Sequence, residues 1–166
     1  MASSLHTGLS PEMIEKPLDK DFSCVIIKTV WNSHITNALC DGALDCFAKA
    51  GLSAGQVKVL DVPGAVELVY GAKRVIDVMH PSAVIVLGCV IRGDTPHFDY
   101  VCDSVTQGTV MINARGDVPV IFGLLTVENE QQALDRAGGC VGNKGFEAAQ
   151  TAIAMANFAC RCRRKE

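Results

Sequence analysis

The sequence predicts an α/β protein, a three-layer α/β/α sandwich around a four-stranded parallel sheet. Short apolar, β-branched segments alternate along the chain with longer segments whose apolar residues recur at helical spacing. The links between them are short, which favours right-handed crossovers and parallel strands. The length of 166 residues suits one domain. We therefore divide the chain into an N-terminal arm, 1–21, and a single α/β domain, 22–166.

The first predicted strand covers residues 24–30, which are short and β-branched. A helix follows, with Ile35 and Cys46 on one face, and Asn32 or Ser33 is a suitable side-chain cap for its start.

The second strand is predicted from the alternation at 57–61 and is stopped by Pro63 and Gly64, where glycine allows close approach of the backbone. The second helix then runs from Val66 to Met79, before the helix-ending pair at 80–81.

The third strand–helix unit contains the candidate catalytic residue. Residues 83–87 form an uninterrupted apolar run, typical of a strand buried on both faces, which breaks at Gly88 and resumes at 89–91. The chain then turns polar at 92–97, and a helical stripe begins at Phe98. A buried strand leading through a glycine-containing loop into a helix is the usual anion site of an open α/β sheet. That loop contains a histidine, the side chain that exchanges protons near neutral pH.

The fourth strand is predicted at 120–125, with caps at 126–129 for a helix that ends near Arg136 and is closed by two glycines at 138–139. A last long helix runs from Phe146 to Cys160, and its basic end complements the helix dipole.

The composition excludes several classes of protein. A net charge of -3 gives no electrostatic reason to expect nucleic acid. No apolar run approaches the ~20 residues of a membrane span, and no signal-peptide pattern is present, so we expect a cytoplasmic protein. Most of the eight cysteines lie in apolar patterns without metal-ligand spacing, which favours reduced thiols and no metal. A mean hydropathy of +0.25 is high for a lone monomer and favours subunit contacts.

Several single features allow two interpretations. The first strand–helix link lacks GxGxxG, and residues 142–145 lack the spacing of a phosphate loop, so neither predicts a nucleotide site. Trp31 is either a core or interface anchor or an aromatic plate for a flat ligand. Arg136 is either a cation favoured at a helix end or a functional residue.

Four segments closely resemble the lumazine synthase family: 63–67, 88–101, 119–126 and 136–145. The likeness extends from about Cys24 to Asn157, and several motifs in the right order make it specific. It implies a flavodoxin-like sandwich and the penultimate step of riboflavin biosynthesis. In that step a ribitylamino-pyrimidinedione condenses with 3,4-dihydroxy-2-butanone 4-phosphate to give 6,7-dimethyl-8-ribityllumazine, phosphate and water. It implies no metal and no organic cofactor.

The resemblance also implies roles for individual residues. Trp31 matches an aromatic that stacks on the pyrimidine ring, and Phe122 one that reaches into the neighbouring subunit's site. The positions that match residues holding the ring and its ribityl chain are Ala65, Val66, Glu67, Cys89, Val90 and Ile91. Those that match the phosphate-binding residues are Asp94, Thr95 and Arg136, and His97 matches the proton-transfer residue. Asp135 and Lys144 are second-tier candidates for orientation or charge balance.

Two residues depart from the family pattern. Val66 stands where many relatives carry an aromatic, so we expect a looser pocket wall. Asp94 places a carboxylate beside a phosphate, so we expect its backbone N–H to bind and its side chain to face away.

The resemblance implies self-association into pentamers, and the short 136–143 link resembles that of relatives forming sixty-subunit shells. The expected partners are small-molecule substrates and further copies of the chain, without nucleic acid or membrane. Two alternatives stay open: a non-catalytic ligand-binding or shell protein, and a flavodoxin-like electron carrier that binds flavin mononucleotide.

Overall fold

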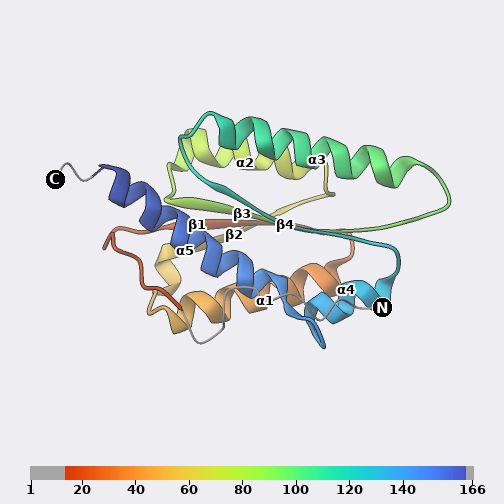
Figure 1. Cartoon of the computed structure of the whole chain (residues 1–166), viewed down its shortest axis with the longest axis horizontal. Coiled ribbons are helices and arrows are strands. Elements are labelled where there is room, and N and C mark those ends of the chain that lie inside the picture. The colour runs from red at the N-terminus through yellow and green to blue at the C-terminus, as the bar shows by residue number, and fades with distance from the viewer. Residues whose placement is uncertain (1–13, 164–166) are drawn as a thin grey trace.

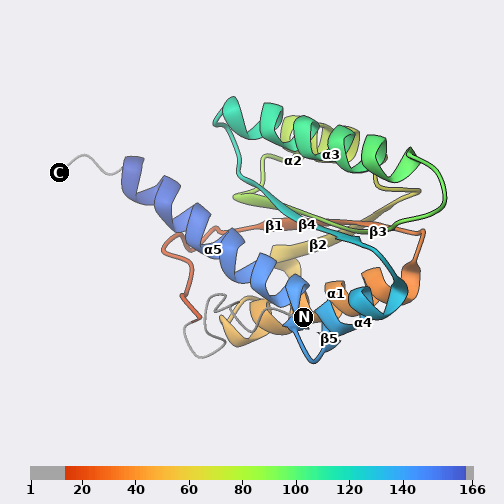
Figure 2. The same ribbon diagram turned by 45° about the vertical axis from the view of Figure 1, so that its right-hand side comes forward.

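The computed structural model describes residues 14–163 and confirms the predicted three-layer α/β fold around a four-stranded parallel sheet (Figure 1). The strands of this sheet are β1 (Cys24–Thr29), β2 (Val57–Val62), β3 (Ala83–Ile91) and β4 (Val120–Val127). The helices are α1 (Ser33–Lys49), α2 (Glu67–Met79), α3 (His97–Ala114), α4 (Glu130–Arg136) and α5 (Lys144–Arg163), with a short 3-10 turn, η1 (Ala54–Gln56). Two views show α2 and α3 on one face of the sheet and α1, α4 and α5 on the other (Figures 1 and 2).

The strand order in the sheet is β2-β1-β3-β4, with every pair parallel. The chain therefore winds in one direction from β1 to β2 and in the other from β3 to β4. The change of direction falls between β1 and β3, and in open α/β sheets ligands bind at the carboxyl ends of the strands beside such a point. The loop that leads from β3 to α3 projects at this edge, on the right of Figure 1.

The core has two parts because neighbouring strand residues point to opposite faces of the sheet. Ile26 and Ile85 pack with α1 and α5 on one face. Val25 and Val84 pack with α2 and α3 on the other. The central strand β3 is buried on both faces over most of its length, as its uninterrupted apolar run predicts.

The buried residue Asn157 of α5 fixes the segment before β1. Its Oδ1 accepts a hydrogen bond from Leu18 N at 2.8 Å, and its Nδ2 donates to Lys16 O at 3.0 Å. Residues 14–21 of the predicted arm are therefore held against α5, whereas residues 1–13 of that arm lie outside the described residues.

Two local predictions about backbone geometry were wrong. The third strand is continuous through Gly88, where a Cβ atom would lie 2.6 Å from the Leu124 side chain. Glycine at this position allows close packing and does not break the strand. Asn32 is the N-cap residue of α1, but its side chain makes no capping hydrogen bond, and Ser33 is already the first residue of the helix.

The region around 137–146 also differs from the prediction. β5 (Ala137–Gly139) and β6 (Gly142–Asn143), which the sequence pattern did not predict, pair as a small antiparallel sheet. The last helix, α5, starts at Lys144, before Phe146. Asn143 fixes this start, because its Oδ1 accepts hydrogen bonds from Gly145 N at 2.9 Å and Phe146 N at 3.1 Å.

Large apolar side chains remain exposed on several elements of the single chain. The most exposed are Trp31, Tyr70, Val78, Tyr100, Val110, Met111 and Phe158. Subunit contacts would cover apolar surface of this kind, and those contacts stay a prediction. Within residues 14–163, none of the helices has the length and apolar character needed to cross a membrane.

All eight cysteines are free, and four of them are buried.

Candidate active site

The carboxyl ends of β1 and β3, the turn between β2 and α2, and the first turns of α2 and α3 surround a cavity of about 620 Å³. Eight of the predicted site residues line it: Trp31, Ala65, Val66, Glu67, Cys89, Val90, Ile91 and His97. They come from four separate segments of the chain. The cavity also has Thr29, Asn32 and Val101 in its wall, none of which the sequence singled out as a site residue.

Trp31 provides an open aromatic surface at this cavity. Its side chain is 68% exposed, although its main chain is fixed by hydrogen bonds from Trp31 N to Pro63 O at 3.1 Å and from Thr29 Oγ1 to Trp31 O at 3.0 Å. The ring lies against Gly64, where a Cβ atom would be 2.6 Å from Trp31 Cε3. An exposed indole ring whose main chain is held in place by hydrogen bonds is suited to stacking on a flat ligand.

The start of α2 forms a second wall. Glu67 Oε2 accepts a hydrogen bond from Gly64 N at 3.1 Å, which closes the turn between β2 and α2. Ala65 is buried beneath the turn, whereas Val66 is 44% exposed. The wall at Val66 therefore carries a small side chain open to the cavity.

The end of β3 forms the third wall. Cys89 is buried, and burial raises the pKa of its thiol to about 11. The thiol is therefore neutral near pH 7 and is no nucleophile. Val90 and Ile91 are half-buried beside it. This end of the strand offers apolar contacts and main-chain polar groups.

His97 begins α3 at the mouth of the cavity. Its side chain is exposed, and its backbone N–H is 3.5 Å from Thr95 Oγ1. Asp94 and Thr95 lie in the exposed loop just before the helix. The unpaired amides and dipole at a helix start favour an anion. A proton-exchanging group and an anion-favouring turn are thus adjacent.

Arg92 fixes the base of this loop. Its Nη2 lies 3.1 Å from Asp99 Oδ1 and its Nε 2.9 Å from Glu128 Oε2. Its guanidinium carbon lies 4.1 Å from the centre of the Phe98 ring. The hydrogen bond with Asp99, followed by that with Glu128, raises the pKa of Arg92. The loop from β3 is thereby joined to α3 and to the end of β4.

Phe122 and Arg136 do not line the cavity that contains His97. They open onto a separate groove of about 550 Å³ along β4, together with Lys144. Phe122 is 41% exposed on this edge strand. Arg136 Nη1 donates to Gln132 O at 3.0 Å, and Lys144 Nζ lies 2.8 Å from Glu147 Oε1. One chain therefore assembles the predicted ring site but holds the predicted phosphate-binding guanidinium elsewhere.

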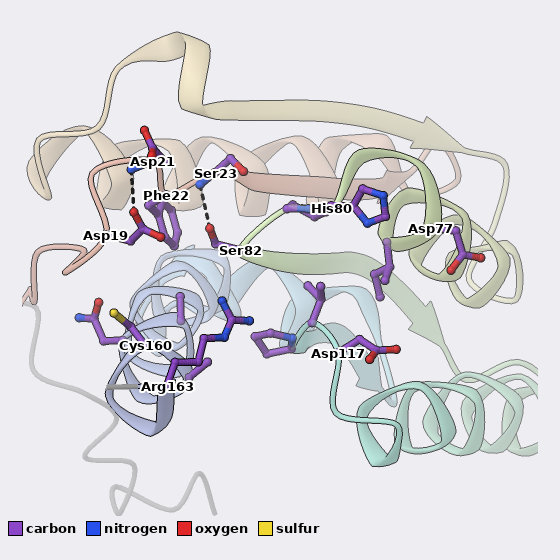
Figure 3. A pocket seen from close by; sticks show the side chains of 17 residues that line it. Asp19, Asp21, Phe22, Ser23, Asp77, His80, Ser82, Asp117, Cys160 and Arg163 are labelled. Carbon is purple, nitrogen blue, oxygen red and sulfur yellow. Dashed lines mark hydrogen bonds between the residues drawn. The ribbon is translucent and has the colours of Figure 1, made fainter. Parts of the chain in front are cut away.

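A larger cavity, about 780 Å³, lies at the opposite edge of the sheet, where the strands begin (Figure 3). Asp19, Asp21, His80, Asp117 and Arg163 line it, and no predicted site residue does. Among the residues that the structure describes, no three His, Cys, Asp or Glu side chains are grouped to hold a metal ion. Because no predicted site residue lines this larger cavity, it is separate from the candidate site.

Asn32 and Lys144 had weak signals in the sequence. Asn32 follows Trp31 just after a strand, where the sequence pattern indicates only a helix cap. Lys144 stands between Gly142 and Gly145 in the sequence, and the structure places it at the start of α5, in the groove of Arg136.

A family model described as 6,7-dimethyl-8-ribityllumazine synthase matches residues 21–159. Similar proteins carry the same name. One from Parabacteroides distasonis is 54% identical over 80% of this chain and 83% of its own length. One from Bacteroides fragilis is 51% identical over 80% of this chain and 93% of its own. A third, from Phocaeicola vulgatus, is 45% identical over 95% of this chain and 94% of its own.

Proposed function

This chain belongs to the 6,7-dimethyl-8-ribityllumazine synthase family, and we propose that its site carries out that reaction as follows. The enzyme is a transferase of riboflavin biosynthesis. It condenses 5-amino-6-(ribitylamino)-pyrimidinedione with 3,4-dihydroxy-2-butanone 4-phosphate to give 6,7-dimethyl-8-ribityllumazine, phosphate and water. The observation that best supports these site roles is the placement of Trp31 and His97 in one cavity.

The pyrimidinedione stacks on Trp31, whose ring is exposed on a fixed main chain. Its polar edge meets the main chain at the end of β3, at Cys89, Val90 and Ile91. The ribityl chain extends toward the start of α2, where Ala65, Val66 and Glu67 line the cavity. A mostly apolar pocket with a few convergent polar groups is what a small heterocycle needs.

The butanone phosphate binds beside His97. The amides of the turn at Asp94 and Thr95 face its phosphate, and the exposed Asp94 side chain turns to solvent. Arg136 supplies the second half of the phosphate site, since a guanidinium binds a phosphate through two parallel hydrogen bonds.

Arg136 comes from a second copy of the chain, together with Phe122. Both residues line the β4 groove at the edge of the sheet, away from the His97 cavity of their own chain. A neighbouring subunit whose β4 groove faces that cavity completes the site and covers Phe122. Lys144 lines the same groove as a second-tier candidate for charge balance, with its Nζ 2.8 Å from Glu147 Oε1 in the single chain.

His97 transfers protons during the condensation. The substrate amine attacks the carbonyl and water leaves as the imine forms, and phosphate is then eliminated. The ribitylamino nitrogen closes the ring onto the remaining carbonyl, and a second water leaves as the lumazine forms. Each step moves a proton on or off nitrogen or oxygen, and a positioned imidazole contributes typically about 10²–10⁴-fold. Holding both substrates together in one site supplies much of the remaining acceleration.

A shared site requires at least two copies in contact, and the size of the assembly is taken from the family resemblance. Pentamers are the proposed unit, and the short link between Arg136 and Asn143 favours the sixty-subunit shell among the larger forms. The proposed organisation within each copy is the arm 1–21 and one domain over 22–166, in a cytoplasmic enzyme.

The direct test is lumazine formation from the two substrates by the purified protein. Product formation without added metal or cofactor supports the proposal. Tight binding of the lumazine without turnover would instead indicate a ligand-binding protein. A yellow protein with redox activity would indicate a flavin electron carrier.

A further inference from the structure

Asn32 has an unusual backbone conformation directly after Trp31. It lies in the left-handed region, with φ 56° and ψ 42°. Few residues other than glycine adopt this conformation, asparagine does so more readily than most, and such residues concentrate at functional sites. The Asn32 carbonyl accepts hydrogen bonds from Ile35 N at 2.9 Å and Thr36 N at 3.1 Å. The main chain of Asn32 therefore forms the turn between β1 and α1, and its side chain takes no part in that turn.

The side chain of Asn32 instead reaches β3. Its Nδ2 donates a hydrogen bond to Cys89 O at 2.9 Å. The pairing of β1 with β3 ends at Lys28 and Leu87, so this carbonyl lies beyond the last paired residues. A carbonyl in a buried strand needs a donor. The asparagine amide supplies one and ties the turn that carries Trp31 to the wall formed by β3.

We propose that Asn32 is a positioning residue for the pyrimidine half of the site, an inference that rests on the proposed function. The left-handed turn places the Trp31 ring against Gly64, and the amide fixes the distance from that ring to the main chain at Cys89. A flat heterocycle must stack on the ring and meet the strand edge at the same time. Without the amide the two walls separate, so the pyrimidine binds less tightly while the phosphate half is unchanged.

Two substitutions separate the amide from the backbone turn. Asn32→Asp keeps the size and the tolerance for the left-handed region, but sets a carboxylate oxygen against the Cys89 carbonyl. Asn32→Gly keeps the conformation and removes the side chain. We expect N32D to weaken binding of the pyrimidinedione, measured by calorimetry, roughly tenfold. The KM for the butanone phosphate should stay within about twofold, which separates this role from a loss of catalysis.

Trp31 is the only tryptophan in the chain, so its fluorescence reports on this turn alone. The emission of N32D and N32G, recorded without substrate, should shift because the ring is no longer held in one place. This readout needs no turnover. If the unaltered protein does not bind the pyrimidinedione, the proposed function fails, and the Trp31 emission then decides whether Asn32 holds the turn.

Asn113→Asp is the matched control. Asn113 Nδ2 also donates to a main-chain carbonyl, Val120 O at 2.9 Å, but at the opposite edge of the sheet. N113D should change neither the pyrimidinedione affinity nor the Trp31 emission. The inference is overturned if N32D binds within twofold of the unaltered protein with unchanged emission, or if N113D reproduces its effects. If N32D does not fold, N32G is judged by the same two criteria.

Discussion

His97 and Trp31 share one cavity and differ in what they offer a ligand. Trp31 presents a broad apolar ring, whereas His97 presents a proton-exchanging group at the start of a helix. We expect His97→Gln to lower kcat about 10²–10⁴-fold, because the variant cannot exchange protons near pH 7. Binding of the pyrimidinedione, measured by calorimetry, should change little. A variant that loses affinity but keeps kcat would contradict the assigned role.

Gly64 permits the contact beneath the Trp31 ring. In Gly64→Ala the new methyl group would lie 2.6 Å from Cε3 and 2.7 Å from Cζ3, so the exposed ring must move. We expect pyrimidinedione affinity to fall roughly tenfold. The unfolding midpoint should change by only ~2 °C, because the ring moves into solvent. Gly55→Ala is the control, since nothing lies within 4 Å of its added methyl. Unchanged affinity with a large loss of stability would show that Gly64 acts on the fold alone.

Among the elements, the loop from β3 to α3 depends on contacts at both ends. Arg92 joins its base to Asp99 of α3 and to Glu128 after β4. We expect Arg92→Gln to lower kcat/KM roughly tenfold or more, because small misplacements of reacting groups are costly. Solvent screens this exposed ion-pair cluster, so the unfolding midpoint should fall by only ~2 °C.

The control for Arg92 is Lys49→Gln. Lys49 also combines a carboxylate and an aromatic partner, with Nζ 2.6 Å from Asp45 Oδ2 and 5.4 Å from the centre of the Phe146 ring. It lies at the end of α1, so its loss should leave kcat/KM unchanged. Equal losses of activity in the two variants would refute a specific role for Arg92.

Hydrophobic periodicity predicted the elements of the main sheet because each of them buries a long, regular apolar face. It missed β5 and β6, since strands of two or three residues carry no periodic signal. It misread Gly88 because the reason for that glycine, the Leu124 side chain, lies on another strand. It misread Asn32 for a similar reason, as the bond to Cys89 spans 57 residues of sequence. A local sequence pattern does not show which residues far apart in the sequence come into contact in the fold.

The residues of the His97 cavity were predicted more completely than the position of Arg136 and Phe122. The buried strand and polar loop pointed to His97, and the family resemblance supplied seven further residues of its cavity but not Thr29, Asn32 or Val101. The resemblance implied that Phe122 reaches into a neighbouring subunit's site, but nothing in the sequence showed that Arg136 would share its separate groove. That separation depends on β4 being the edge strand, which the strand order decides and the local sequence does not.

For the whole molecule, the proposed shared site makes activity a property of the assembly. If His97 of one copy meets Arg136 of the next, two variants with different defects should complement each other. His97→Ala and Arg136→Ala, each inactive alone, form mixed assemblies when produced together with different tags and purified through both. Random mixing in equal amounts leaves about one quarter of the sites with both original residues.

Lumazine formation by that doubly purified mixture is the decisive measurement. A shared site predicts roughly a quarter of the activity of the unaltered enzyme, while either variant alone stays near background. Activity of the mixture no higher than that of the separate variants, with mixed assemblies present by mass, would show that His97 and Arg136 do not meet between copies.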